Sequence, residues 1–297
     1  MKVCSRFVGF WVCLLLWIPA IAAANSPLRV VTSFTILADM VQQVGGDAVT
    51  VKSLVGPNGD AHRYEPTPMD AQAILAADCF VVNGLGFEGW MERLVNSSSF
   101  RGTLVTASQG TTPLLMAGNG QPDPHAWQDV ASARVYVGNI AEALLRLAPQ
   151  RAEAIRANAA RFDGELAELD QWVRSQFATI PVARRKIITS HDAFGHFARA
   201  YGVTFLSPMG ASSDAEPSAK GVAKLIVQAR QEGIRGIFME NIENPRLLQQ
   251  LAREAGLTLG GTLHADALST AEGPAPTYAA MIRRNVTLLR GAMAGGE

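Results

Sequence analysis

The chain has 297 residues, and its 26 basic and 26 acidic side chains give a formal net charge of zero. A balanced charge offers no electrostatic footprint for nucleic acid or for an anionic membrane surface, so we expect neither partner. The length suggests two domains, at about 150 residues per domain.

The first 24 residues have the pattern of a secretory signal peptide. Lys2 and Arg6 precede an apolar run over residues 7–18, and alanines at 22–24 are the small residues that a signal peptidase accepts. An apolar run of about 12 residues is short for a membrane span, and no run of roughly 20 follows it. We expect cleavage after residue 24, which leaves a soluble periplasmic protein of net charge −2.

The cysteines exclude an internal disulfide in the mature protein. Cys4 and Cys13 lie inside the signal, and Cys13 sits too early in it to be a lipid-attachment site, so we expect no lipoprotein. Cys79 alone remains, in the apolar segment CFVV. We interpret it as a buried small hydrophobe rather than as a nucleophile or a soft metal ligand.

From residue 28 the sequence alternates short β-rich runs with amphipathic stretches, the pattern of βα units around a mostly parallel sheet. Each half of the chain contains four such runs. The predicted strands are LRVVT (28–32), VTVKSL (49–54), CFVVN (79–83) and TLVT (103–106), then KIITS (186–190), VTFL (203–206), GIFM (236–239) and LTLGGTL (257–263).

Helices are predicted between the strands. Residues 67–70 (TPMD) provide a capping residue, a proline at the first helical position and an acidic third position, which begin a helix ending near Ala76. Apolar residues at helical spacing over 222–229 predict another helix, which Gly233 ends. Residues 149–177 contain no strand signal and carry one apolar stripe, which predicts a long helix of roughly 40 Å joining the two halves.

Three histidines lie in polar, turn-rich loops near the ends of predicted strands. They are His62, His125 and His191, and Asp266 follows the last strand in the same sense. In an open α/β sheet, ligands bind beyond the carboxyl ends of the strands. Three imidazole nitrogens and one carboxylate oxygen complete a tetrahedral zinc shell without a thiolate.

Two further histidines are weaker candidates. His196 lies five residues after His191, so the two would not share a helical face, and we expect a structural role. In an extended segment His264 points the same way as Asp266, which makes it a candidate alternate or outer ligand.

Nearby carboxylates are interpreted without a ligand role. Asp129 is placed to cap the following helix or to orient the imidazole of His125. Glu240 and Asp60 are interpreted as solvated charges at the rim of the site.

Residues 84–89 (GLGFEG) match the dinucleotide fingerprint G-x-G-x-x-G, but their context rejects it. The motif follows the third predicted strand, begins only a short helix, and has no acidic residue near position 105 for a ribose hydroxyl. There is also no Walker A motif, so any ATP hydrolysis belongs to another polypeptide.

Six segments carry a resemblance to a known family: GPNGDAHRYEPTPMD (56–70), NGLGFEGW (83–90), PDPHAWQD (122–129), SHDAFGHFARAYG (190–202), EPSAKGVAKLI (216–226) and LHADAL (263–268). Over nearly the whole mature length the chain resembles the cluster 9 (cluster A-I) solute-binding proteins, the metal-binding components of zinc and manganese ABC importers. The resemblance implies an α/β fold of two lobes, each a mostly parallel sheet with flanking helices, joined by one long rigid helix. We expect a signal at 1–24, lobes at 25–148 and 181–297, and the linking helix at 149–180.

The resemblance also implies the ligands. The family's first two fall on His62 and His125, the third on His191 and the fourth on Asp266. Relatives that resemble manganese binders have Glu at the third position, so His191 favours zinc. The sequence departs from many zinc members in lacking a His-rich loop before the second ligand, and from relatives in having His196 where an aromatic residue is usual.

The expected function is periplasmic capture of Zn²⁺ by a monomer and delivery to an inner-membrane ABC permease, with a metallochaperone as a further partner. Because imidazoles must lose a proton to bind metal, we expect affinity to fall below about pH 6.5. The first alternative is a manganese or iron binder of the same importer class. The second is an exported zinc hydrolase, which the absence of H-E-x-x-H and a shell closed by Asp266 argue against.

Overall fold

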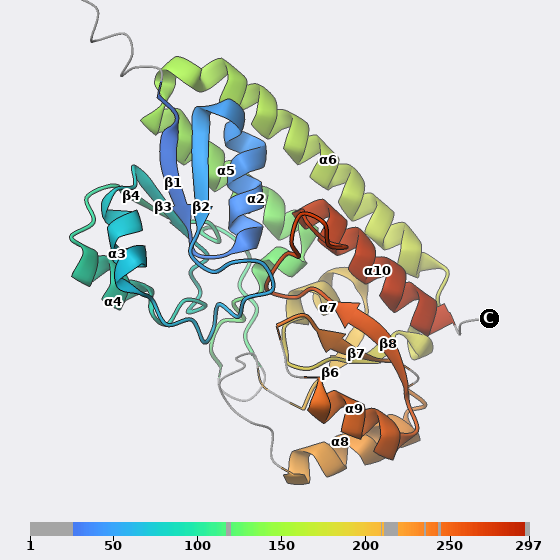
Figure 1. Ribbon diagram of the computed structural model, residues 1–297. Coiled ribbons are helices and arrows are strands. Elements are labelled where there is room, and N and C mark those ends of the chain that lie inside the picture. The colour runs from blue at the N-terminus through green and yellow to red at the C-terminus, as the bar shows by residue number, and fades with distance from the viewer. Residues whose placement is uncertain are drawn as a thin grey trace, which may run out of the picture.

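The computed structural model describes residues 26–116, 120–208, 210, 219–234, 236–242 and 245–294 of the chain, so the predicted signal peptide lies outside the described residues. Two lobes, each built on a parallel sheet of four strands, lie at opposite ends of one long helix (Figure 1). All eight predicted strands are present, which confirms the predicted fold class.

The N-terminal lobe has strand order β2-β1-β3-β4, all parallel. Its strands are β1 (Leu28–Thr32), β2 (Val49–Ser53), β3 (Cys79–Val82) and β4 (Thr103–Thr106). Its helices are α2 (Thr35–Gly45), α3 (Pro68–Leu75), α4 (Met91–Ser98) and α5 (Val130–Leu147), with 3-10 turns at Gly46–Ala48 and Ala126–Gln128. The predicted capping box of α3 is present: Thr67 accepts from the Asp70 backbone, and Asp70 accepts from the backbone of Thr67.

The C-terminal lobe repeats this arrangement, with strand order β6-β5-β7-β8. Its strands are β5 (Lys186–Ile188), β6 (Thr204–Leu206), β7 (Gly236–Glu240) and β8 (Thr258–Leu263). Its helices are α7 (Gly195–Tyr201), α8 (Ala219–Gln231), α9 (Arg246–Ala255) and α10 (Tyr278–Ala294), with a 3-10 turn at Val182–Arg184. The loops that follow β2 in the first sheet and β5 and β8 in the second meet between the lobes, at the carboxyl ends of these strands.

The long helix α6 (Ala152–Ala178) follows a 3-10 turn at Pro149–Arg151 and runs alongside both lobes (Figure 1). It contacts α2 and α5 of the first lobe and α7 and α10 of the second. Its buried residues are Ile155, Phe162, Leu166, Leu169, Val173 and Phe177, which form the stripe that the sequence predicts.

One hydrophobic core runs through both lobes. It joins the interior of the first sheet to Phe194, Phe197, Leu263 and Tyr278 of the second half. A smaller core lies under α8 and α9. Because the large core is shared, burial of apolar surface fixes the position of the carboxyl ends of the two sheets relative to each other.

Cys79 is completely buried in this core, and burial raises the pKa of its thiol to about 12. This confirms its interpretation as a buried small hydrophobe. Within the residues described, no helix is both long enough and apolar enough to cross a bilayer.

Candidate metal centre

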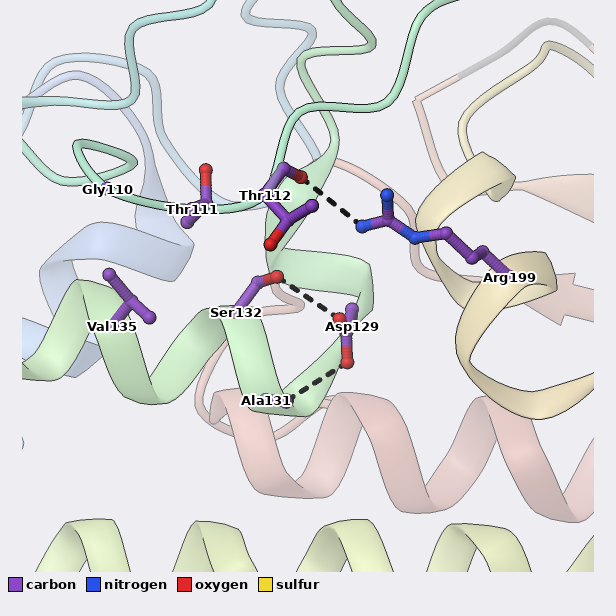
Figure 2. A pocket seen from close by; sticks show the side chains of 8 residues that line it. All are labelled: Gly110, Thr111, Thr112, Asp129, Ala131, Ser132, Val135 and Arg199. Carbon is purple, nitrogen blue, oxygen red and sulfur yellow. Dashed lines mark hydrogen bonds between the residues drawn. The ribbon is translucent and has the colours of Figure 1, made fainter.

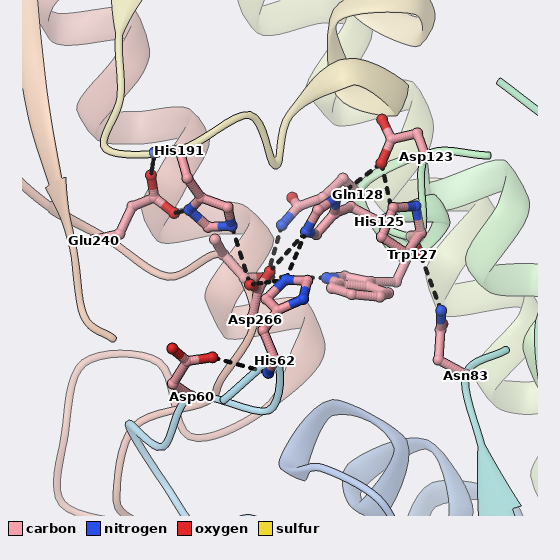
Figure 3. A network of polar contacts seen from close by, with 12 residues as sticks. Asp60, His62, Asn83, Asp123, His125, Trp127, Gln128, His191, Glu240 and Asp266 are labelled. Carbon is pink, nitrogen blue, oxygen red and sulfur yellow. Dashed lines mark hydrogen bonds and ion pairs between the residues drawn. The ribbon is translucent and has the colours of Figure 1, made fainter. Parts of the chain in front are cut away.

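Four side chains converge on one point between the lobes (Figure 3). His62 lies in the loop after β2, His125 precedes the 3-10 turn before α5, His191 follows β5, and Asp266 follows β8. One ligand atom from each lies within 4.8 Å of the other three. The structure thus brings together the four residues that were predicted from the sequence to be metal ligands.

Three distances between donor atoms are close to the edges of a tetrahedral zinc shell. His62 Nε2 lies 3.3 Å from His125 Nε2 and 3.3 Å from Asp266 Oδ2. His191 Nε2 lies 3.2 Å from the same carboxylate oxygen. Zinc bonds of about 2.0–2.1 Å give tetrahedral edges of about 3.3–3.4 Å. The chemistry of the four donors and these three distances suit a small divalent cation.

Asp123 orients His125. Its Oδ1 accepts from the backbone N–H of His125 at 3.0 Å and lies 2.8 Å from the ring Nδ1. Burial favours the neutral carboxyl, but these contacts outweigh it and lower the pKa of Asp123. A protonated Nδ1 leaves Nε2 as the neutral donor that a metal binds. The orientation of His125 was one of the two roles predicted for Asp129. The spacing of Asp123, two residues before His125, could have indicated Asp123 for this role.

Glu240 does the same for His191, which makes its interpretation as a solvated rim charge wrong. Glu240 is only 2% exposed, and its Oε1 accepts from the backbone N–H groups of Ser190 and His191. Its Oε2 lies 2.8 Å from His191 Nδ1, a short ion pair rather than a well-aligned hydrogen bond. Burial alone would lower the pKa of His191, but Glu240 and Asp266 outweigh it and raise this pKa well above its usual value.

Asp266 is the anionic centre of the group. Burial would raise the pKa of its carboxyl, but the imidazoles of His125 and His191 outweigh burial and hold that pKa well below its usual value. Its Oδ1 is buried, accepts no hydrogen bond within the described part of the chain, and lies 3.7 Å from His125 Nε2. A buried carboxylate oxygen without a hydrogen bond is costly in an apolar interior and is favourable beside a cation.

The segment that carries Asp266 is anchored from the other lobe. Trp127 Nε1 and Gln128 Nε2 both donate to the carbonyl of Ala265, at 2.9 and 2.8 Å. These two residues follow His125 directly. The turn at residues 125–128 therefore carries His125 of its own lobe and also holds the backbone next to Asp266 of the other lobe.

His62 is the outermost of the four converging residues, with a side chain that is 5% exposed while the other three are fully buried. Asp60 accepts from its backbone N–H at 2.8 Å, and Trp90 Nε1 donates to the carbonyl of Ala61. The edge of Phe87 packs against its ring, with centroids 4.6 Å apart. The hydrogen bonds of its loop backbone and the contact with the Phe87 ring therefore hold the His62 imidazole in place.

The loop at residues 84–89 positions Phe87 against His62. Gly84 and Gly86 have φ values of 85° and 80°, which a side chain would strain. The Glu88 carboxylate accepts from the backbone N–H of Asn83 and of Gly84. The backbone N–H groups of Asn83 and Gly84 are therefore already bonded within the loop, and Phe87 of this loop packs against His62.

His196 and His264 lie outside the four-residue group. His196 Nε2 faces the carbonyl of Asp123 at 3.3 Å, and its Nδ1 accepts from Arg199. His264 Nδ1 faces the carbonyl of Ala267 at 3.3 Å, and its burial lowers its pKa. Both are buried structural residues, as expected for His196.

A separate groove of about 400 Å³ lies between α5 and α7 (Figure 2). Asp129 caps α5 there by accepting from the backbone of Ala131 and from Ser132, which confirms its predicted capping role. Arg199 donates to the carbonyl of Thr112 across the groove. None of the four converging residues lines it.

Comparison with known proteins places the chain in a family. The profile described as ZnuA, zinc-uptake complex component A, periplasmic, matches residues 30–292. The iron-binding protein YfeA of Yersinia pestis is 34% identical over 285 residues, 92% of this chain and 90% of that protein. The manganese-binding lipoprotein MntA of Halalkalibacterium halodurans is 32% identical over 259 residues, 87% of this chain and 86% of that protein.

A solved structure agrees with these matches. The periplasmic zinc-binding protein TroA from Treponema pallidum superposes with a TM-score of 0.86 at 28% identity, covering 90% of this chain and 99% of that one. The chain belongs to the ZnuA family of metal-binding solute-binding proteins, which serve ABC importers and are not enzymes.

Proposed function

We propose that this protein captures one Zn²⁺ through His62, His125, His191 and Asp266 and delivers it to an ABC permease. The observation that carries the proposal is the convergence of four donor atoms, all within 4.8 Å of one another, in a largely buried site. Imidazoles and a single carboxylate suit zinc, whereas manganese prefers a shell richer in oxygen.

Relatives named for manganese and for iron make these metals the alternative cargo. The test is elemental analysis of the purified protein, followed by competition of Zn²⁺ against Mn²⁺ and Fe²⁺ for the metal-free form. We expect one zinc per chain and displacement of either rival by zinc. A protein that holds manganese against equimolar zinc has a different cargo and the same importer role.

The hydrolase alternative is excluded, because the family consists of substrate-binding proteins and not of enzymes. The arrangement of the four side chains agrees, since Asp266 takes the position that a hydrolytic zinc site leaves open for water.

For delivery, we propose that the protein acts as a monomer whose lobes, 25–148 and 181–297, stay at a fixed spacing along the helical linker 149–180. The core shared by both lobes opposes wide opening, so release requires local movement of the ligand loops. Loading by a metallochaperone is a further proposal, and transfer assays with and without the permease test both partners.

We also propose that the signal peptide is cleaved after residue 24 and that no lipid is attached, although relatives such as MntA are named lipoproteins. The intact mass of the mature protein tests this. A chain beginning at Asn25 supports cleavage, and the added mass of acyl chains contradicts it.

A further inference from the structure

We propose that His196 is a positioning residue for the metal centre, which holds Asp123 from the opposite lobe and, through Asp123, the ring of His125. The inference rests on the proposed metal capture and adds a residue that lies outside the group of four converging side chains.

Helix α7 of the C-terminal lobe holds a segment of the N-terminal lobe. His196 is completely buried, and its Nε2 lies 3.3 Å from the backbone carbonyl oxygen of Asp123. Arg199, one turn later on α7, donates to the carbonyl of Thr112 at 3.3 Å (Figure 2). It also donates to the carbonyl of Pro113 at 3.3 Å. Two side chains of one helix therefore hold the segment that leads to His125 at both of its ends.

The partners of the His196 ring determine which of its nitrogens carries the proton. Nδ1 lies 3.2 Å from Nη2 of Arg199, and because a guanidinium can only donate, Nδ1 is the acceptor. The carbonyl of Asp123 can only accept, so Nε2 carries the proton and donates to it. Burial lowers the pKa of His196, which keeps the ring in the neutral form that these two contacts require. An aromatic ring without nitrogen atoms makes neither bond.

Asp123 connects this contact to the ligand. Its Oδ1 accepts from the backbone N–H of His125 at 3.0 Å and lies 2.8 Å from the ring Nδ1 (Figure 3). Its own backbone N–H donates to the carbonyl of Leu114 at 2.7 Å. The bond from His196 to the Asp123 carbonyl completes this set of contacts. A shift of Asp123 therefore moves the hydrogen-bond partner that sets the orientation of the His125 ring.

Gly195 allows α7 to approach the carboxylate of Asp123. A β-carbon at position 195 would collide with Oδ2 of Asp123, so the helix lies directly against this carboxylate. The next residue, His196, bonds to the carbonyl of the same aspartate, 73 positions away in the sequence. Two neighbouring residues of α7 thus contact both the side chain and the backbone of Asp123, which restricts its position more than either contact alone.

The experiment compares wild type with H196F, H196Q and Y201F. H196F keeps an aromatic ring and loses both hydrogen bonds, whereas the amide of H196Q can both donate and accept. Y201F is the matched control on α7. The hydroxyl of Tyr201 donates to Asp170 and accepts from the backbone N–H of Val130, so Y201F also loses two bonds, neither of them to Asp123.

Three measurements separate positioning from stability. Stopped-flow transfer to a chelator gives the rate of zinc dissociation, and the visible spectrum of the Co²⁺-loaded protein reports the geometry of the ligand shell. Thermal melting of the metal-free protein gives its stability, which a merely structural residue would change without changing the other two.

We expect zinc to dissociate about 2–10-fold faster from H196F, the range for the loss of one hydrogen bond, with a shifted Co²⁺ spectrum. H196Q should restore most of the wild-type rate and spectrum. Y201F should melt at a lower temperature and keep both. An H196F protein with the wild-type rate and spectrum, or a Y201F protein that changes both as much as H196F, overturns the proposal.

A further measurement uses wild type and does not depend on the folding of a variant. Long-range proton–nitrogen NMR of the ¹⁵N-labelled protein at pH 7.5 shows which nitrogen of His196 carries the proton. We expect Nε2–H with an unprotonated Nδ1. A proton on Nδ1 overturns the proposal, because the carbonyl of Asp123 then receives no bond from the ring. Wild type that binds no metal would instead show that the proposed function is wrong.

Discussion

The two lobes contribute unlike halves to the metal centre. The N-terminal lobe provides His62 and His125, whose backbone N–H groups bond to aspartates two residues earlier in their own loops. The C-terminal lobe provides His191 and Asp266, both fully buried, and Glu240 from a neighbouring strand. The C-terminal half thus contributes the negative charge of Asp266 and the imidazole whose pKa is raised, His191. The N-terminal half contributes His62, which among the four converging residues is the one with a partly exposed side chain. We expect substitutions in the two halves to differ in kind.

The largest expected effect comes from removing the charge at the centre. Asp266→Asn keeps the shape of the side chain but leaves three imidazoles around an uncharged group. Loss of one member of a buried ionic group costs about 3–5 kcal/mol, and a cost of that size lowers zinc affinity on the order of 100–4000-fold. Competition titration measures this, with the exposed Asp163→Asn as control. A loss below tenfold would show that Asp266 is not a ligand.

Proton competition gives the next largest effect. Because Glu240 and Asp266 raise the pKa of His191, zinc competes with a proton there up to a higher pH than at an ordinary imidazole. Affinity should rise about tenfold per pH unit between pH 5.5 and 7.5, so the dependence extends above the pH 6.5 expected for an ordinary imidazole. Calorimetry in two buffers of different ionisation enthalpy counts the released proton. Equal affinities at both pH values would contradict the three-histidine site.

The pKa shifts of His191 and Asp266 also predict how the stability of the metal-free protein depends on pH. Above neutrality this trend is opposite to that of zinc affinity. Because the folded pKa of His191 is raised, its contribution is complete below the unfolded value near 6.5 and is lost as pH rises through the folded value. The folded pKa of Asp266 is lowered, so its contribution is present above the unfolded value near 3.8 and is lost as pH falls through the folded value. Denaturant midpoints against pH should therefore decline above neutrality in the metal-free protein and not in the zinc-loaded protein.

A smaller effect concerns how the loop of His62 is tied to the other lobe. Asn241 Nδ2 donates to Asn58 Oδ1 at 2.9 Å and to the carbonyl of Ala267 at 3.1 Å. Asn241→Ala removes both bonds, but only the bond to Asn58 crosses between the lobes. At about 0.5–1.5 kcal/mol for that one bond, zinc should dissociate roughly 2–10-fold faster. Stopped-flow transfer to a chelator measures the rate. Asn139→Ala, which loses two similar bonds within one lobe, should leave it unchanged.

The smallest effect tests the anchor between the lobes. Trp127→Phe keeps an aromatic ring against Phe34 and Phe87 but loses the bond from Nε1 to the carbonyl of Ala265. Gln128 still donates to that carbonyl, so the free energy of unfolding should fall by about 1 kcal/mol. Urea denaturation gives the value. A loss of several kcal/mol would exceed the contribution of one hydrogen bond and would show that the smaller ring leaves a cavity in the core.

Local patterns in the sequence determined most of the fold. The eight strands follow from β-branched runs, α3 from the capping box of Thr67 and Asp70, and α6 from its apolar stripe. These features depend on neighbouring residues, and tertiary contacts did not override them. Parallel strands predicted that loops gather at the carboxyl edge of each sheet, whereas the convergence of His62 and His125 with His191 and Asp266, which belong to two sheets, was implied by the family resemblance.

Only the tertiary structure decided the surroundings of the ligands. Period-two alternation put His264 on the same side as Asp266, but β8 ends at Leu263, so alternation no longer applies and His264 turns to the carbonyl of Ala267. Glu240 was interpreted as rim charge because a carboxylate at a strand end is normally solvated. Its burial against His191 follows from the pairing of β5 with β7, a contact between residues about 50 positions apart that no local pattern encodes.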